Sequence, residues 1–289
     1  MNTLMTLKDR YTEVRQRIAN AAQRSGRSAN SVILVAVTKN AEPDQIRDLI
    51  KLGHADFGEN RVQQLVQRAT IIDEWLGRHR SLPGASRPRP ATPDDDMWSD
   101  YAPQADRPGP VAPSPSTKVR WHMIGHLQRN KARKVVETCR LVHSVDSLRL
   151  AEELQQIAFK REQPVEVLLQ VNCSGEEQKY GCAIAAAPHL AEQIETMIQV
   201  KVRGLMTMAA YSANPEAARP TFGRARELFH EIRDSGVVGP QFNILSMGMS
   251  GDFEVAIDEG SNLVRVGTAL FGEAKPGADS AEDEDDDAD

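Results

Sequence analysis

Eight short segments with the character of β-strands alternate with helical segments along most of this chain. Most are continuous apolar runs rich in valine, leucine and isoleucine, which is typical of strands buried on both faces of a parallel sheet. They cover residues 31–39, 54–58, 119–125, 141–145, 165–172, 200–206, 243–246 and 263–267. Helical spacing of apolar residues covers 4–22, 43–52, 62–76, 128–138, 147–161, 183–197, 215–234 and 252–260.

Repeated strand–helix units predict a parallel α/β sheet, and eight of them in about 250 residues match a (β/α)8 TIM barrel. The alternative is a doubly wound open sheet. No GxGxxG motif follows the first predicted strand, which argues against the dinucleotide-binding form of that alternative. We therefore expect one barrel domain over residues 1–277.

Two segments fall outside this pattern. Residues 78–118 contain nine of the 16 prolines and show neither helical nor strand periodicity, so we expect a flexible surface insertion. Residues 278–289 carry eight acidic residues and no basic one, which predicts a disordered acidic tail.

The charge balance and the cysteines limit the possible environments and partners. The net charge is −6, and without the eight acids of the tail it is +2, which gives no reason to expect nucleic-acid binding. No apolar run is long enough to span a membrane, and the N-terminus lacks the apolar core of a secretion signal. The three cysteines form no CxxC pair. We therefore expect a cytoplasmic protein with reduced cysteines, and a monomer.

The first strand is predicted to end at Lys39, where α/β folds place their chemistry. Partial burial there would favour the neutral amine, which is a nucleophile toward aldehydes and ketones. The alternative is that Lys39 leaves the sheet and points into solvent. The residues alone leave both possibilities open.

The last two strands end in turns rich in glycine, serine and threonine. Ser246, Met247 and Ser250 follow or end the seventh strand, and Gly267 and Thr268 follow the eighth. TIM barrels often bind phosphate with these two loops and a helix N-terminus. The sequence therefore indicates a phosphate site, and ordinary turns are the alternative.

Arg265 lies within the last apolar strand, and a buried arginine needs a partner because it keeps its charge. That partner is either a neighbouring carboxylate or a ligand atom that accepts a hydrogen bond. A lysine able to form an imine, a phosphate site and an inward arginine together suggest pyridoxal 5′-phosphate. His122 and His126 are separated by a glycine-containing turn, so we expect no metal site there.

Seven segments, in order, make the chain resemble the pyridoxal-phosphate homeostasis protein family. They are residues 37–39 (VTK), 57–60 (FGEN), 121–131 (WHMIGHLQRNK), 143–146 (HSVD), 202–206 (VRGLM), 245–250 (LSMGMS) and 264–268 (VRVGT). These proteins are single domains similar to the N-terminal barrel of alanine racemase. The insertion, the tail and Thr38, where serine is common, depart from the family pattern.

The resemblance implies a role for each matching residue. Lys39 would form a Schiff base with pyridoxal phosphate, and Arg265 would face the pyridine nitrogen. Ser246, Ser250, Gly267 and Thr268 would hold the phosphate, and Asn60, Met206 and Met247 would line the ring pocket. Because arginine keeps its proton, the pyridine nitrogen would stay unprotonated, which weakens the ring as an electron sink.

Three functions remain open at this point. The first is a carrier or buffer of pyridoxal phosphate with little catalysis, whose partners would include apoenzymes that depend on this cofactor. The second is an amino-acid racemase, which needs a second acid or base on the opposite face of the bound substrate. In alanine racemase a tyrosine of a C-terminal domain fills that role, and the sequence shows no such domain after residue 277. The third, a class I aldolase, usually has its lysine on a later strand. We expect the first.

Overall fold

The computed structural model describes residues 5–80, 118–176 and 180–273. Residues 81–117 of the expected insertion and the whole acidic tail lie outside this part of the chain. The structure corrects one boundary of the insertion: helix α3 (Val62–Arg80) includes residues 78–80.

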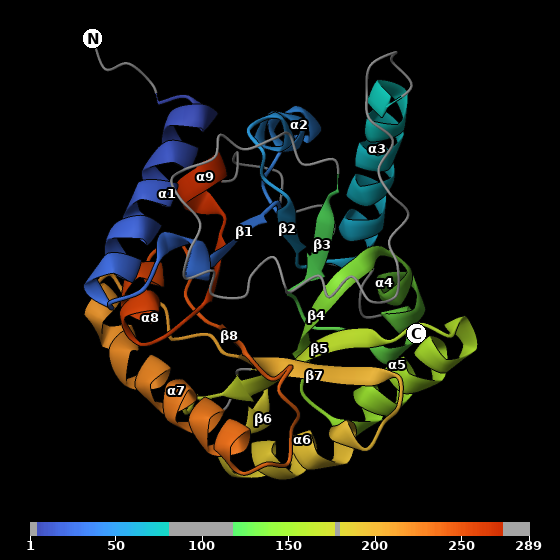
Figure 1. The fold of residues 1–289 in the computed structure, drawn as a ribbon. Coiled ribbons are helices and arrows are strands. Elements are labelled where there is room, and N and C mark those ends of the chain that lie inside the picture. Colours follow the sequence, from blue (N-terminus) through green and yellow to red (C-terminus); the bar gives the residue numbers. More distant parts are fainter. Residues whose placement is uncertain (1–4, 81–117, 177–179, 274–289) are drawn as a thin grey trace.

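Eight parallel strands close into a barrel, as expected (Figure 1). Around the ring the order is β4-β3-β2-β1-β9-β8-β7-β5, and pairing of β4 with β5 closes it. The strands are β1 (Ile33–Val37), β2 (Asp56–Glu59), β3 (Arg120–Met123), β4 (Cys139–Val145), β5 (Val165–Asn172), β7 (Val200–Met206), β8 (Ile244–Ser246) and β9 (Leu263–Val266). A two-residue strand that the sequence did not reveal, β6 (Cys182–Ala183), pairs with β5 outside the ring.

The helices surround the strands in Figure 1. In addition to α3 they are α1 (Leu7–Arg24), α2 (Pro43–Lys51), α4 (Ala132–Thr138), α5 (Leu148–Arg161), α6 (Ala187–Glu195), α7 (Arg219–Asp234), α8 (Phe253–Asp258) and α9 (Thr268–Phe271). The expected helices over 128–138, 183–197 and 215–234 each begin with a 3-10 turn: η3 (Arg129–Lys131), η4 (Ile184–Ala186) and η5 (Pro215–Ala218). The turn η1 (Ala29–Ser31) precedes β1. Among the described residues, no helix has the length and apolar character needed to cross a membrane.

Alternation of side chains along the strands divides the core into two parts. In β1, Leu34 and Ala36 belong to the large outer cluster packed against the helices. Ile33 and Val35 belong to a smaller inner cluster, which fills the barrel together with residues of β4, β5, β7, β8 and β9. The inner cluster has no member from β2 or β3. On that side of the barrel the interior is polar.

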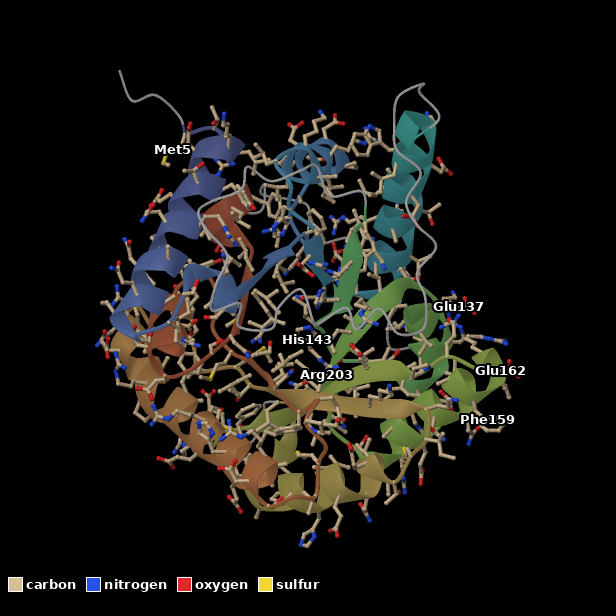
Figure 2. The ribbon with its side chains drawn as sticks, viewed as in Figure 1. Met5, Glu137, His143, Phe159, Glu162 and Arg203 are labelled. Atoms are coloured by element: carbon tan, nitrogen blue, oxygen red, sulfur yellow. The ribbon has the colours of Figure 1, made fainter. Side chains whose placement is uncertain are left out.

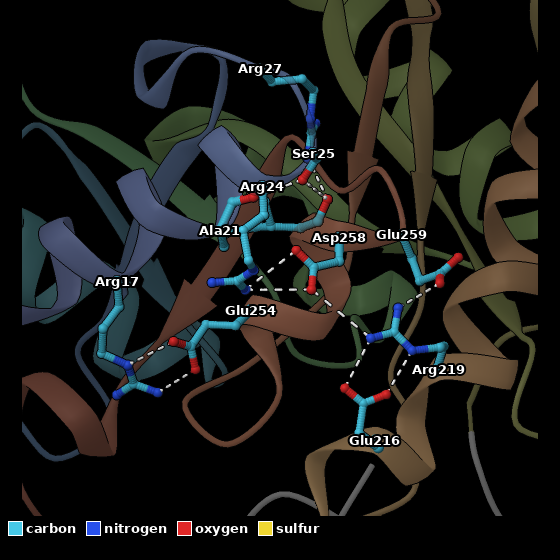
Figure 3. A network of polar contacts seen from close by, with 11 residues as sticks. Arg17, Ala21, Arg24, Ser25, Arg27, Glu216, Arg219, Glu254, Asp258 and Glu259 are labelled. Atoms are coloured by element: carbon cyan, nitrogen blue, oxygen red, sulfur yellow. Dashed lines mark hydrogen bonds and ion pairs between the residues drawn. The ribbon is translucent and has the colours of Figure 1, made fainter.

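Ion pairs fix α8, which follows the loop after β8, against α1 and α7 (Figure 3). Arg17 of α1 forms a bidentate pair with Glu254 of α8. Arg219 of α7 binds Glu259 just beyond α8 and comes within 3.9 Å of Asp258. The loop that carries Ser250 is thereby attached to a helix held from two sides.

Candidate functional site

Lys39 follows β1 at the C-terminal end of the barrel, two residues after Val37. The expectation of partial burial is wrong for this structure, because the Lys39 side chain is exposed. Its backbone is held firmly: Arg68 Nη2 donates to the carbonyl oxygens of Lys39 and Ala41, each at 3.2 Å.

A buried glutamate, Glu59, positions the Arg68 side chain. Glu59, the last residue of β2, is fully buried and accepts hydrogen bonds from Arg68 and from the hydroxyl of Thr38. Burial raises the pKa of Glu59, although the Arg68 charge opposes the shift. Glu59 and Arg68 were not among the residues predicted from the sequence. Together they connect β2 and α3 to the loop that carries Lys39.

A second group of donors lies at the ends of β8 and β9. Ser250 Oγ accepts hydrogen bonds from the backbone N–H groups of Gly267 (3.1 Å) and Ala269 (3.3 Å). Thr268, the first residue of α9, is exposed beside them. Gly248 permits the approach of this loop to α8, because its φ is +96° and a Cβ would lie 2.6 Å from that of Ala256. Because the sequence predicts a phosphate site at these two loops, we call Ser250, Gly267, Thr268 and Ala269 the anion cradle.

The anion cradle lies next to the strand that leads to Lys39. Strands β1 and β9 pair in parallel, with Ala36 opposite Val266. A Cβ on Gly267 would lie 3.4 Å from the carbonyl oxygen of Val37, so the two strand ends are in close contact. The lysine and the cradle therefore lie side by side at the mouth of the barrel.

Five buried polar residues form a hydrogen-bonded series inside the barrel, which we call the polar column. Arg265 Nη1 lies 2.5 Å from Ser246 Oγ, and Ser246 Oγ lies 3.1 Å from His143 Nδ1. His143 Nε2 lies 2.9 Å from His122 Nδ1, and His122 Nε2 lies 3.1 Å from Asp56 Oδ1. His143 is labelled within the ring of strands in Figure 2.

The polar column runs along the barrel from one end to the other. Asp56 is the first residue of β2, and Arg120, the first residue of β3, binds it with Nε at 2.7 Å and Nη2 at 2.6 Å. Ser246 is the last residue of β8. Burial alone would raise the pKa of Asp56, but hydrogen bonds from Arg120 and His122 outweigh it and hold that pKa far below its usual range. Asp56 is therefore ionised.

Arg265 is a buried cation whose side chain forms no ion pair with a described residue, although the charge of Asp252 acts on it from a distance. It is 3% exposed, and its side chain donates only to Ser246 Oγ and to the carbonyl oxygen of Thr207 at 2.9 Å. No carboxylate in the described part of the chain forms an ion pair with it. Burial lowers its pKa to about 10, so it stays charged at neutral pH. An arginine has five N–H donors, and the two bonds leave others for an acceptor atom at the mouth.

The other predicted cofactor-binding residues do not all lie at one place in the structure. Ser246 belongs to the polar column, where His143 and Arg265 occupy its hydroxyl. Met206 belongs to the inner cluster, at the end of β7. Met247 packs in the outer cluster between strands and helices instead of in the expected ring pocket, because it alternates with Ser246. Asn60 is exposed after β2, with its carbonyl packed against Gly125.

A groove of about 680 Å³ lies beside these residues, at the ends of β3 and β4. It includes His126 and Asp146, and His126 is stacked on Tyr180 with ring centroids 4.3 Å apart. None of the nine predicted cofactor-binding residues lines it. Across the ranges that the structure describes, no group of three or more His, Cys, Asp or Glu side chains is placed to hold a metal ion.

Buried histidines predict a loss of stability in mild acid. Burial lowers the pKa of His54 to about 4, and burial also lowers the pKa of His143 well below its ordinary value. The folded state therefore excludes protons that the unfolded state binds, so stability is complete above about pH 6.5 and decreases as the pH falls toward 4. We expect His54 alone to contribute a loss of about 2 kcal/mol between pH 7 and 5, measured by urea unfolding.

The matched variants are His54→Phe, which keeps a packed ring, and His189→Gln, whose side chain is 85% exposed. His54→Phe should weaken the pH dependence of the free energy of unfolding, and His189→Gln should leave it unchanged. An unaltered slope in His54→Phe would show that His54 is not the group that titrates.

The comparisons with known proteins agree with this geometry. The model of the family "Alanine racemase, N-terminal domain" matches residues 11–275. The pyridoxal phosphate homeostasis protein of Aquifex aeolicus is 37% identical over 94% of this chain and 100% of its own length. That of Escherichia coli K12 is 33% identical over 90% of this chain and 93% of its own.

Solved structures are similar in the same way. An unknown protein from Bifidobacterium adolescentis matches with a TM-score of 0.75 and 34% identity over 93% of this chain and 98% of its own. PipY of Synechococcus elongatus with pyridoxal phosphate (PLP) bound matches with a TM-score of 0.63 and 30% identity over 90% of this chain and 100% of its own. An alanine racemase of Clostridium difficile, at 12% identity and a TM-score of 0.59 over 94% of this chain and 58% of its own, shares the fold.

Proposed function

Because the chain belongs to the pyridoxal phosphate homeostasis protein family, built on the alanine racemase N-terminal barrel, we propose that it binds pyridoxal 5′-phosphate. In this proposal the cofactor is held as a Schiff base on Lys39, and the protein stores or delivers it in the cytoplasm with little catalysis of its own. The relative from Synechococcus elongatus, whose structure has PLP bound, supports the choice of ligand.

One observation supports the site most directly: Lys39, the anion cradle and Arg265 are at the carboxyl ends of neighbouring strands β1, β8 and β9. When bound, pyridoxal phosphate supplies an aldehyde and a conjugated ring. The N–H groups of Gly267 and Ala269 converge on Ser250 Oγ, and in this proposal a phosphate oxygen would replace that hydroxyl oxygen as their acceptor. The unneutralised Arg265 suits a ligand that has an acceptor atom and negative charge. The residues present therefore fit the group.

Each part of the site has a separate task in this proposal. Glu59 and Arg68 hold the backbone of Lys39 in place, so that the exposed amine stays at the mouth. Arg265 would donate to the pyridine nitrogen of the bound cofactor and would keep it unprotonated, because the guanidinium does not release its proton at neutral pH. That limits electron withdrawal by the ring, which favours storage over reaction.

The test is a visible absorption spectrum after addition of pyridoxal phosphate, followed by borohydride reduction and peptide mapping. We expect an absorption band and one reduced adduct, on Lys39. Lys39→Ala should lose both and keep only weak noncovalent binding, because the anion cradle remains. Lys51→Ala, which removes another exposed lysine, should behave like the unaltered protein.

Two outcomes would contradict the proposal. If Lys39→Ala still gave a borohydride-reduced adduct in undiminished yield, the bond to the cofactor would be on another lysine. Rapid exchange of the α-hydrogen of alanine into deuterated solvent by the loaded protein would replace the carrier function with racemase-like catalysis.

A further inference from the structure

The polar column has two ends whose chemistry fixes the direction of every hydrogen bond between them when both imidazole rings are neutral. At one end the Arg265 guanidinium can only donate, and at the other the ionised Asp56 can only accept. All five members are buried, from 0% exposure for Ser246, His143 and His122 to 7% for Asp56, so water does not compete for these bonds. A neutral imidazole carries one donor and one acceptor, and a serine hydroxyl donates one hydrogen bond and accepts others.

Working inward from Asp56 assigns the protons. His122 must donate from Nε2 to Asp56, so its Nδ1 is the acceptor in the neutral ring. His143 must then donate from Nε2 to His122 Nδ1, which leaves His143 Nδ1 as an acceptor. The Ser246 hydroxyl donates to His143 Nδ1, and its oxygen accepts from Arg265. With both rings neutral, the two histidines are therefore Nε2–H tautomers.

This order determines what Ser246 presents to Arg265. If His143 were reversed, its Nδ1–H would donate to Ser246 Oγ, and the hydroxyl proton would no longer be held by His143. With a neutral His122, the ionised Asp56 prevents this reversal from the opposite end of the barrel. Arg265 is held at two points, Ser246 Oγ and the Thr207 carbonyl, and only the first depends on the column.

We propose that Asp56, His122 and His143 are positioning residues for the cofactor site: through Ser246 they orient the Arg265 guanidinium toward the pyridine nitrogen of the bound cofactor. None of the three is placed at the mouth with Lys39 or the anion cradle. They act through another residue, and their effect is on the hydrogen bond that the ring nitrogen receives. This inference rests on the proposed binding of pyridoxal phosphate.

The experiment uses pyridoxal 5′-phosphate labelled with 15N in the ring and records its resonance in the full-length protein at one fixed pH. Asp56→Asn removes the charge at the far end, and His143→Leu breaks the column in the middle. We expect both to move the pyridine resonance toward that of a nitrogen without a hydrogen bond. His143→Leu should also raise the dissociation constant about tenfold, the effect of a lost hydrogen bond to a charged group.

Two variants separate positioning from general damage. Glu166→Gln neutralises another buried carboxylate, which binds Arg140 at 3.1 Å and Arg203 at 3.5 Å outside the column. It should lower stability without moving the pyridine resonance. His143→Gln keeps an acceptor and a donor on one side chain, and should restore the resonance that His143→Leu shifts.

The proposal is overturned if Asp56→Asn and His143→Leu bind the labelled cofactor with its resonance unchanged. It is also overturned if 15N spectra of the histidines in the unaltered protein show an Nδ1–H tautomer at His122 or His143. The second measurement does not require the variants to fold or the cofactor to bind. Failure of the proposed function looks different, because the unaltered protein would then form no adduct on Lys39.

Discussion

Replacement of Asp56 by alanine is expected to lower the free energy of unfolding by about 3–5 kcal/mol. The substitution leaves Arg120 and His122 facing a site from which their carboxylate has been removed, and the three side chains are largely buried. An uncompensated buried charge is much more costly than the pair is stabilising. Urea unfolding at pH 7, monitored by circular dichroism, measures the change.

The control is Asp44→Ala, which removes an aspartate–arginine ion pair of similar length on the surface. Asp44 accepts from Arg47 at 2.7 Å, but its side chain is 85% exposed, so the expected change is about 0.5 kcal/mol or less. The double variant Asp56→Ala, Arg120→Met should recover part of the lost free energy of unfolding, because it also removes the arginine charge that Asp56 balanced. If Asp56→Ala and Asp44→Ala lower the free energy of unfolding equally, the ion pair of Asp56 is not buried in solution.

The strand pattern was sufficient to predict the barrel. Residues 165–172 were predicted as a strand and are β5, because a run such as Val-Glu-Val-Leu-Leu-Gln-Val is buried on both faces of a closed sheet. Helix boundaries were less accurate where 3-10 turns begin a helix, and α9, with four residues, is too short to show a period. These elements are determined by local hydrogen bonds and not by the burial of an apolar face.

Individual site residues were harder to predict than the positions of the strand ends. The location of Lys39, Ser250 and Gly267 follows from the rule that chemistry gathers at the carboxyl ends of barrel strands. The polar column does not, because His143 and Ser246 are 103 residues apart and meet only when the barrel closes. The sequence held one sign of the polar column. Arg120, His122 and His143 are polar residues within strands that are otherwise buried. His122 and His143 also occupy inward positions of their strands.

The sequence left open whether the partner of Arg265 is a carboxylate or a ligand, and the structure shows no carboxylate in an ion pair with it among the described residues. We expect Arg265→Met to raise the stability of the cofactor-free protein by about 1–2 kcal/mol. Desolvation of an unpaired cation costs several kcal/mol, and the carbonyl of Thr207, left without this donor, returns only part of it. The same variant should bind pyridoxal phosphate about 10- to 100-fold more weakly, from the loss of a charged donor. Urea unfolding and a binding titration measure the two effects.

Arg203 is the matched control, because it is a buried arginine, 5% exposed, that does have a carboxylate partner, Glu166. Arg203→Met should lower the free energy of unfolding by about 1–2 kcal/mol, because Glu166 loses one arginine and keeps Arg140, and should leave cofactor affinity unchanged. If Arg265→Met instead destabilised the cofactor-free protein as much as Arg203→Met does, Arg265 would be a structural residue. The expected contrast follows from charge balance. Arg265 has no ion-pair partner among the described residues, so its burial lowers the stability of the cofactor-free protein. A ligand that supplies an acceptor for Arg265 would restore that stability.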